Sequence, residues 1–389
     1  MTTRAYCIIL MTAFSTMLGL GIISPFLPEL VGRHGANGFW IGMIFAGFGI
    51  SRGLIVPFIG KISDRLGRKL FVASGLFLFS VISLLYPRAG NIYGLTFVRL
   101  LHGLSAGMII PIVMAYVGET SEKGKEAGTV GFLIMMFYFG LAAGPLLGGY
   151  LGQIYGLDPV FYAMSALGAV TFLIVVFFLP DIQKTAGEGS PQTVTFKDLA
   201  HHRYVMAILI IAVFIAFMLA VFMSFLPSIA VNDRVDVSHI GIIISLGIFI
   251  AGLLQVPFGR VADSLDRIGK FLQAGTGSAI SMMALFAVPF CPDFRALLVA
   301  GLFVGLGTAI SISALSNLSI GVGKKIGMGS WMGIYNAAFS VGFVLTPIIA
   351  GVIMDHLGID SVFYLFGVFA FFVLLILFYY AYKKGYKQQ

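Results

Sequence analysis

The stretch Gly60-Lys61-Ile62-Ser63-Asp64-Arg65-Leu66-Gly67-Arg68-Lys69 decides how the rest of the chain is arranged. Five of its ten residues are charged, although only 10% of the 389 residues of the chain are, and it lies between two long apolar segments. Charges at this density between two membrane spans must lie in water at one face of the membrane. Because four of the five charges are basic, the positive-inside rule predicts that this face is cytoplasmic.

The composition places the chain in a membrane. Of its residues, 59% are hydrophobic, and the mean hydropathy is +1.01, which is more apolar surface than a soluble protein of this size needs. We expect twelve membrane-spanning helices, each long enough to cross a hydrocarbon core of about 30 Å. The predicted spans are residues 5–28, 38–59, 70–87, 91–117, 127–152, 159–180, 203–231, 238–259, 270–291, 293–318, 330–354 and 360–383.

The loop charges predict how the chain is inserted. Of the 24 Lys and Arg residues, 18 fall on the same side as the charged stretch, together with both termini. This bias explains the net charge of +8 better than nucleic-acid binding does. We therefore expect an integral, multi-pass protein of the plasma (inner) membrane with both termini in the cytoplasm.

The chain contains two copies of one unit. A second version of the charged stretch runs from Gly259 to Arg267, and the segment 144–162 matches the segment 346–364 at a constant offset of 202 residues. Between the copies, a polar stretch that includes Gly187-Glu188-Gly189-Ser190-Pro191 has the composition of a linker. We predict an all-α membrane protein with a six-helix bundle in residues 1–180, a cytoplasmic linker in 181–202 and a second, pseudo-symmetric six-helix bundle in 203–389.

Several motifs resemble those of the major facilitator superfamily, and the resemblance covers the whole chain. The stretch 60–69 is similar to the superfamily's loop G-x-x-x-D-R-x-G-R-K, and residues 99–103 resemble the helix-four motif R-x-x-Q-G, with His102 in place of the usual Gln. Residues 140–149 resemble the helix-five motif G-x-x-x-G-P-x-x-G-G, which is typical of the drug:proton antiporter (multidrug efflux) branch. Residues 18–28 are similar to the helix-one pattern of the same exporters.

The resemblance implies that the charged loops form a latch that holds the two halves together at the cytoplasmic side. The alternative is that these charges only fix the topology; Asp64 and Gly67 favour a latch, because neither contributes to topology. The latch residues would be Gly60, Asp64, Arg65, Gly67 and Arg68 in the first loop and Asp263 and Arg267 in the second.

The helix-five motif places small residues on one helix face. Gly140, Gly144 and Gly148 recur at every fourth position, so two helix backbones can approach closely there. Pro145 removes one backbone hydrogen bond and can kink the helix, and Gly149 completes the motif. Close packing is what the spacing itself indicates, whereas the link to efflux comes from the resemblance.

The charged residues inside the predicted spans are few and basic. Arg99 and His102 share one face of helix four, and Arg52 lies in helix two. Each also has a structural interpretation: Arg99 satisfied by backbone carbonyls, Arg52 reaching toward the interface, and His102 a neutral core residue. The functional interpretation makes His102 a proton carrier, since the ordinary pKa of histidine is about 6.5.

Carboxylates are absent from the middle of every predicted span. All sixteen fall at helix ends or in loops, and Glu29 and Asp355 come nearest to the membrane. Since exporters of cationic drugs in the resembled branch usually carry a deep acid, its absence argues against cationic substrates and leaves Glu29 as the other candidate for proton coupling. Arg52 and Arg99 favour an anionic or zwitterionic amphiphile as the small-molecule partner.

The predicted substrate cavity takes residues from both halves. Besides the basic side chains it includes hydroxyl, amide and aromatic groups, and the amides are favoured because an amide in hydrocarbon needs a partner. These residues are Arg52, Arg99, His102, Ser24, Tyr138, Phe222, Asn317, Tyr335 and Asn336.

The sequence thus predicts a secondary active transporter that moves small amphipathic molecules by alternating access, and the resemblance makes a proton-coupled exporter the first hypothesis. The alternatives are a facilitator or exchanger of organic anions, metabolites or siderophores, and, from other classes, a lipid translocase or a non-transporting membrane sensor. No G-K-[ST] motif, metal-spaced His/Cys cluster or nucleophile–base pair occurs, so we expect no enzyme, no metal and no cofactor beyond a proton or other ion gradient. A monomer in the lipid bilayer, without nucleic acid, is expected.

Overall fold

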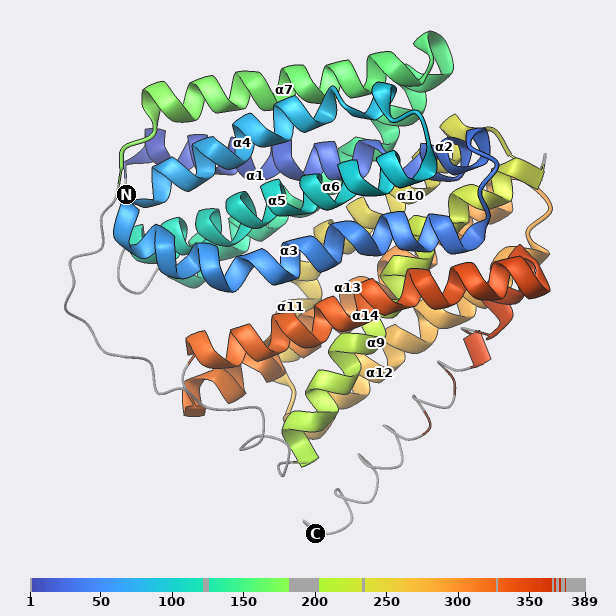
Figure 1. Cartoon of the computed structure of the whole chain (residues 1–389). Coiled ribbons are helices and arrows are strands. Elements are labelled where there is room, and N and C mark those ends of the chain that lie inside the picture. The colour runs from blue at the N-terminus through green and yellow to red at the C-terminus, as the bar shows by residue number, and fades with distance from the viewer. Residues whose placement is uncertain are drawn as a thin grey trace, which may run out of the picture.

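Long apolar helices make up the described part of the chain (Figure 1). Figure 1 is a computed structural model, and the structure describes residues 2–121, 126–181, 203–232, 235–326, 328–365, 367–368, 371 and 375. Within these residues, eleven helical segments are long and apolar enough to cross a membrane, and they coincide with the first eleven predicted spans. Most of the twelfth span, 360–383, and all but the first residue of the predicted linker, 181–202, lie outside the described residues.

The N-terminal half, here the described residues 2–181, holds the first six spans. Its elements are α1 (Thr3–Ile22), η1 (Ser24–Phe26), α2 (Leu27–Arg33), α3 (Gly38–Leu66), α4 (Arg68–Ser83), η2 (Tyr86–Arg88), α5 (Ile92–Thr120), α6 (Glu126–Tyr155) and α7 (Leu157–Phe178).

The C-terminal half, here the described residues 203–375, repeats this arrangement. Its elements are α9 (Arg203–Phe225), η3 (Leu226–Asn232), α10 (Val237–Leu253), α11 (Gln255–Ser264), α12 (Arg267–Ala287), η4 (Val288–Phe290), α13 (Phe294–Ile326) and α14 (Met328–Leu357), followed by helical residues 359–365.

Prolines and glycines explain where the helices break. Pro25 and Pro28 are the second residues of η1 and α2, so the first span consists of three helical pieces rather than one. Gly67 has a φ of 95°, which lets α3 turn directly into α4. Gly156 and Gly358, which are equivalent in the repeat, have φ values of 83° and 85°, so the backbone turns in the same way after α6 and after α14.

Two helix pairs join the halves. Within the N-terminal half α5 packs against α3 and α4, and α1 packs against α6; within the C-terminal half α13 packs against α10 and α12, and α14 packs against α9. Across the halves α3 pairs with α14 and α6 pairs with α10. Figure 1 shows α14 running alongside α3.

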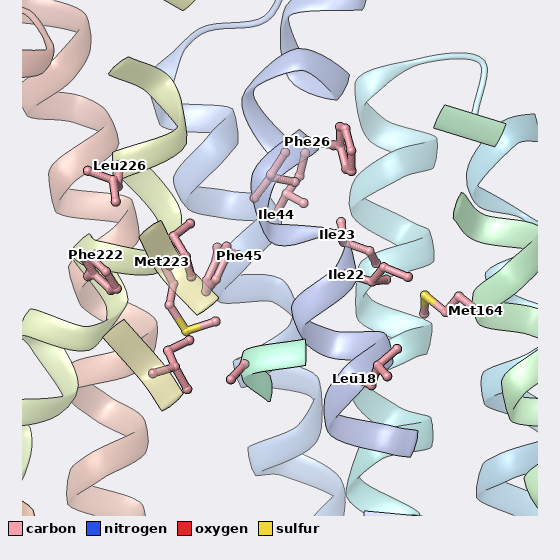
Figure 2. Packing of buried hydrophobic residues seen from close by; sticks show 14 of the residues in the cluster. Leu18, Ile22, Ile23, Phe26, Ile44, Phe45, Met164, Phe222, Met223 and Leu226 are labelled. Carbon is pink, nitrogen blue, oxygen red and sulfur yellow. The ribbon is translucent and has the colours of Figure 1, made fainter. Parts of the chain in front are cut away.

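A continuous apolar cluster crosses from one half to the other (Figure 2). It contains Leu18 and Ile22 of α1, Phe45 of α3, and Phe222 and Met223 of α9. Since each of these side chains is less than 9% exposed, the halves share one packed core at this level of the molecule.

The two ends of the bundle carry different turns. The charged-loop end carries the α3–α4 turn at Gly67 and the α11–α12 turn at Leu265 and Asp266. The opposite end carries the turns that lead into α3, α5 and α7.

Candidate functional site

Arg99 of α5 lies inside the N-terminal half. Its side chain is 2% exposed, and its guanidinium carbon lies 5.9 Å from the ring centres of both Phe45 and Phe48 of α3. In the described part of the chain, neither Nε nor Nη1 of Arg99 has a hydrogen-bond partner. The structure therefore holds a buried cation whose donor groups are not all used.

His102 lies one turn further along α5 and is surrounded by aromatic rings. The Tyr86 hydroxyl lies 3.0 Å from His102 Nδ1, and the rings of Phe48 and Phe79 lie 6.0 and 4.6 Å from the imidazole. Nε2 has no partner among the described residues, and His102 is fully buried. The predicted proton carrier thus sits in the interior of one half, not on an open cavity wall.

Tyr86 connects His102 to Arg99, and the sequence did not single it out. Its hydroxyl lies beside the Arg99 guanidinium as well as beside the imidazole, and its ring stacks on Phe161 of α7 at 4.7 Å. Tyr86 stands sixteen residues before His102, next to Pro87 at the end of a predicted span, and no local pattern marks such a pairing. The three side chains form what we call the Arg99 cluster: Arg99, Tyr86 and His102.

Arg52 is not part of this cluster. The backbone of Arg52 on α3 faces Gly107 of α5, whereas Arg99 lies eight residues earlier on α5. At a rise of about 1.5 Å per residue, this separates the two levels by about 12 Å along the helix. The structure therefore does not bring the two arginines of the predicted cavity together.

Tyr138 and Tyr335 do come together across the halves. Tyr138 of α6 lies close enough to Tyr335 of α14 for the two hydroxyls to interact electrostatically, and Tyr138 also packs against Gly252 of α10. The Tyr335 ring lies 6.4 Å from that of Trp331. This pair is the part of the predicted cavity that the structure places between the two halves.

The other predicted cavity residues lie apart. Ser24 Oγ donates to the carbonyl of Met223 at 2.9 Å, so this hydroxyl joins η1 to α9 across the halves. Phe222 is 1% exposed and packs against Gly247 of α10. Asn336 is exposed on α14, and its carbonyl accepts a hydrogen bond from a side chain one turn later.

Glu29 is also distant from the Arg99 cluster. Its carboxylate pairs with Arg33 at 3.0 Å on the short helix α2 at the opposite end, and both side chains are exposed. Of the two candidates for proton coupling, Glu29 is therefore exposed at the opposite end, whereas His102 is buried in the interior of the N-terminal half.

Two hydrogen bonds of the first charged loop lie within its own half. Arg68 Nη1 donates to Ser63 Oγ at 2.7 Å, and the Lys69 backbone N–H donates to Asp181 at 3.3 Å. A Cβ at Gly67 would lie 2.7 Å from Asp181 Oδ2, so only glycine fits beside this carboxylate. The side chains of Asp64 and Arg65 lie outside the described residues.

The second loop behaves in the same way. Asp263 accepts a hydrogen bond from Asn317 of α13, and the guanidinium of Arg267 lies 4.8 Å from the ring centre of Tyr204. Asn317 therefore faces the second charged loop and not the Tyr138–Tyr335 pair. Gly60 of the first charged loop has no neighbouring atom within 4 Å of the position that a side chain would take, so it makes no close contact there. The latch between halves stays a prediction.

The helix-five motif lies between two neighbours of α6. Gly140, Gly144 and Gly148 each face the backbone of α1, which confirms the close packing that their spacing predicts. On the other side, the Pro145 carbonyl contacts Gly241 of α10, and Gly149 contacts the next turn of that helix. The motif thus joins α6 both to its own half and to the other half.

A carboxylate closes the opposite end. Asp355, at the end of α14, accepts hydrogen bonds from the backbone N–H groups of Gly38 at 2.6 Å and Phe39 at 2.8 Å, the first residues of α3. Gly351 lies against Gly38 so closely that neither position has room for a side chain. This is a helix N-cap supplied by the other half of the protein, which we call the Asp355 cap.

The contacts between the halves gather toward the opposite end. The Asp355 cap, the Ser24–Met223 bond and the packing of Gly149 on α10 all lie there, and the Tyr138–Tyr335 pair lies deeper. The two helical bundles are in contact through α3–α14 and α6–α10, and buried polar groups lie near that contact. This arrangement is that of a membrane transport protein made of two halves.

Comparison with known proteins gives the family. The Major Facilitator Superfamily model matches residues 9–320 and 208–389, so the chain belongs to this superfamily. It is 25% identical over 375 residues to an uncharacterized MFS-type transporter of Methanocaldococcus jannaschii, covering 95% of this chain and 96% of that protein. It is 28% identical over 353 residues to the quinolone resistance protein NorA of Staphylococcus aureus, covering 88% of each.

A solved structure shares the fold. A bacterial homologue of the human lysosomal transporter Spinster, in an inward-facing and unoccupied conformation, superposes with a TM-score of 0.78 over 96% of this chain and 94% of that chain, at 14% identity. The fold prediction is thereby confirmed, and membership of a superfamily of transporters agrees with the prediction that the chain is not an enzyme.

Proposed function

We propose that this superfamily transporter is a proton-coupled exporter of small amphipathic molecules, with its charged-loop end in the cytoplasm. The observation that carries the proposal is the helix-five motif, which contacts α1 and α10 at once. A relative that shares 88% of its length with this chain is named for quinolone resistance, which supports export of amphipathic compounds.

The proposed cycle is alternating access between the two halves. The contacts at the opposite end correspond to a conformation closed on that side, and the similarity to an inward-facing transporter supports this assignment. In the other conformation the Asp355 cap would open, and the charged loops would meet across the halves.

Proton coupling is proposed for His102. The imidazole shares a hydrogen bond with Tyr86, and Tyr86 lies beside Arg99. Protonation of the imidazole would therefore raise the electrostatic energy of the buried Arg99 guanidinium nearby. Glu29 is the second candidate, but its ion pair with Arg33 lies in the open at the opposite end.

A second candidate function is the exchange or facilitated movement of organic anions. The observation that favours it is Arg99, a buried cation with unpaired donors in a half whose helices carry no acid near it. A cationic cargo would meet repulsion at such a site, whereas an anionic or zwitterionic amphiphile would not.

Transport by the purified protein in liposomes tests both functions. A pH gradient is imposed, and the flux of amphipathic cations is compared with that of anions of matched size. The exporter proposal predicts movement of cargo against its gradient only while the proton gradient lasts, and loss of this pH dependence in His102→Gln, which introduces the residue usual in the superfamily motif. Glu29→Gln is the matched variant. Flux of anions that does not depend on the proton gradient would favour the second function. Absence of flux of both cations and anions would contradict both functions.

A further inference from the structure

We propose that Arg99 forms an internal site for one small monovalent anion of halide or carboxylate chemistry, held inside the N-terminal half. The observation behind it is the charge balance of the Arg99 cluster, which contains hydrogen-bond donors in excess and no anionic partner. The proposal does not require that the anion be transported.

The guanidinium has donors that the protein does not use. Arginine has five N–H donors and no acceptor, and it stays charged in proteins. At Arg99 both Nε and Nη1 lack a partner within the described chain, and the side chain is 2% exposed. A buried charge without a partner is costly, so a group of opposite charge is expected at these nitrogens.

The neighbouring side chains cannot supply that group. Arg99 presents an N–H group to the Tyr86 oxygen, and the Tyr86 hydroxyl shares a hydrogen bond with His102 Nδ1. His102 Nε2 has no partner among the described residues. A phenol and a neutral imidazole carry no negative charge, so neither side chain is a counter-ion for the guanidinium.

The surrounding helices offer no carboxylate either. Residues 3–28, 38–63 and 68–117, which form most of α1, α3, α4 and α5, contain neither Asp nor Glu. Two carboxylates at the opposite end have other partners: Asp355 caps α3, and Glu29 pairs with Arg33. Within these described helices no carboxylate pairs with Arg99, so we infer that the counter-ion comes from outside the chain.

Aromatic side chains limit what can enter. The rings of Phe45 and Phe48 lie at equal distances from the guanidinium carbon, and Phe45 also contacts Phe343 of α14, at 5.8 Å between ring centres. Phe45 thus contacts both Arg99 and the other half of the protein. Movement of α14 away from α3 would free Phe45 and open the site, and its apolar wall favours a small ion with little hydration.

The anion has two possible sources that share this chemistry. It is either an inorganic anion from solution, such as chloride, or the carboxylate of an amphipathic cargo. Water alone is the competing explanation, since water could satisfy the unpaired nitrogens of Arg99 without any anion.

Equilibrium binding of radioactive chloride to the purified full-length protein tests the proposal. Ionic strength is kept constant with gluconate, a polyhydroxy carboxylate that is too strongly hydrated to enter a site with an apolar wall. We expect saturable binding of one chloride per chain, competed by formate and nitrate but not by sulfate. Arg99→Gln should weaken binding by roughly 10- to 100-fold, the range for losing hydrogen bonds to a charged group. Arg88→Gln is the matched control, because Arg88 is an exposed arginine of the same half that donates to Leu84.

The outcomes separate the sources and can overturn the idea. Displacement of chloride by octanoate identifies a cargo carboxylate as an occupant, whereas chloride binding unaffected by octanoate identifies an inorganic ion. Arg99→Lys keeps the charge and should bind chloride about tenfold more weakly, which covers the case in which Arg99→Gln does not fold. Absence of saturable binding to the wild-type protein, or equal binding in Arg99→Gln, refutes the site in favour of water. Since no flux is measured, failure here is distinct from failure of the transport proposal.

Discussion

Removal of the Asp355 cap is the most direct test of how the two halves are held together. In Asp355→Ala the backbone N–H groups of Gly38 and Phe39 lose the carboxylate that accepts from them at 2.6 and 2.8 Å. We expect the opposite end to open more often, because this carboxylate links α14 to α3 across the halves.

The size of the effect follows from the geometry. Two hydrogen bonds to a charged group could contribute several kcal/mol if buried, but Asp355 is exposed, so the range for helix N-caps of about 0.5–2 kcal/mol is the better guide. Taking about 1–2 kcal/mol, the ratio of open to closed molecules should rise roughly 5- to 30-fold. Asp355→Asn keeps one acceptor oxygen and should fall between the wild type and alanine.

Distances between spin labels measure this ratio. Labels at Gly90 and Arg295 place one probe on each half at the opposite end, after Cys7 and Cys291 are replaced by serine. The distance distribution of Asp355→Ala should gain a longer component.

The control is Asp158→Ala, which removes an exposed acid in the first turn of α7, at the same end but within one half. It should leave the distribution as in the wild type. If Asp355→Ala also gave the wild-type distribution, the hydrogen bonds of the cap would not contribute to closure, and the reasoning from helix N-cap energies would be wrong.

Three further substitutions test packing and conformation, each by thermal unfolding in detergent. Gly144→Val should lower stability by about 1–3 kcal/mol, because the new side chain would push α6 away from α1; Gly131→Val, where space is open, should cost much less, and equal losses would contradict the packing role. Gly67→Ala should destabilise by about 1 kcal/mol or more, since φ is 95° and a carboxylate fills the space, whereas Gly60→Ala should be neutral or stabilising; the reverse order would refute the strain argument. Tyr86→Phe should cost about 1–3 kcal/mol, because it removes the oxygen that contacts both the His102 imidazole and the Arg99 guanidinium, and no change in melting temperature would show that these contacts contribute nothing.

Much of the fold could be predicted from the sequence because it depends on local patterns. The apolar segments predict the spans, and the spacing of Gly140, Gly144 and Gly148 predicts a helix face that packs closely. The equal backbone turns at Gly156 and Gly358 follow from the same residue at equivalent positions of the repeat.

The site could be predicted only in part, because it depends on contacts between distant residues. Arg99 and His102 were recognisable as ionisable residues within a span, but their partner Tyr86 belongs to another helix and carries no signal of its own. Asp355 was recognisable as an acid near the membrane, yet its role as a cap requires that α3 begin beside the end of α14. The predicted cavity combined residues such as Ser24 and Asn317 that tertiary packing directs to opposite ends of the bundle.

Among the described residues the Asp355 cap has no counterpart on the second helix pair, although Gly149 packs on the start of α10 as Gly351 packs on the start of α3. The residue 202 positions before Asp355 is Gln153, which is uncharged, so α6 meets α10 through packing while α3 meets α14 through packing and charge. Salt screens only the charged contact. The two helix pairs that join the halves therefore differ in their response to salt: higher ionic strength at the opposite end would weaken the α3–α14 contact and leave the α6–α10 contact unchanged, so the opposite end would separate first between α3 and α14.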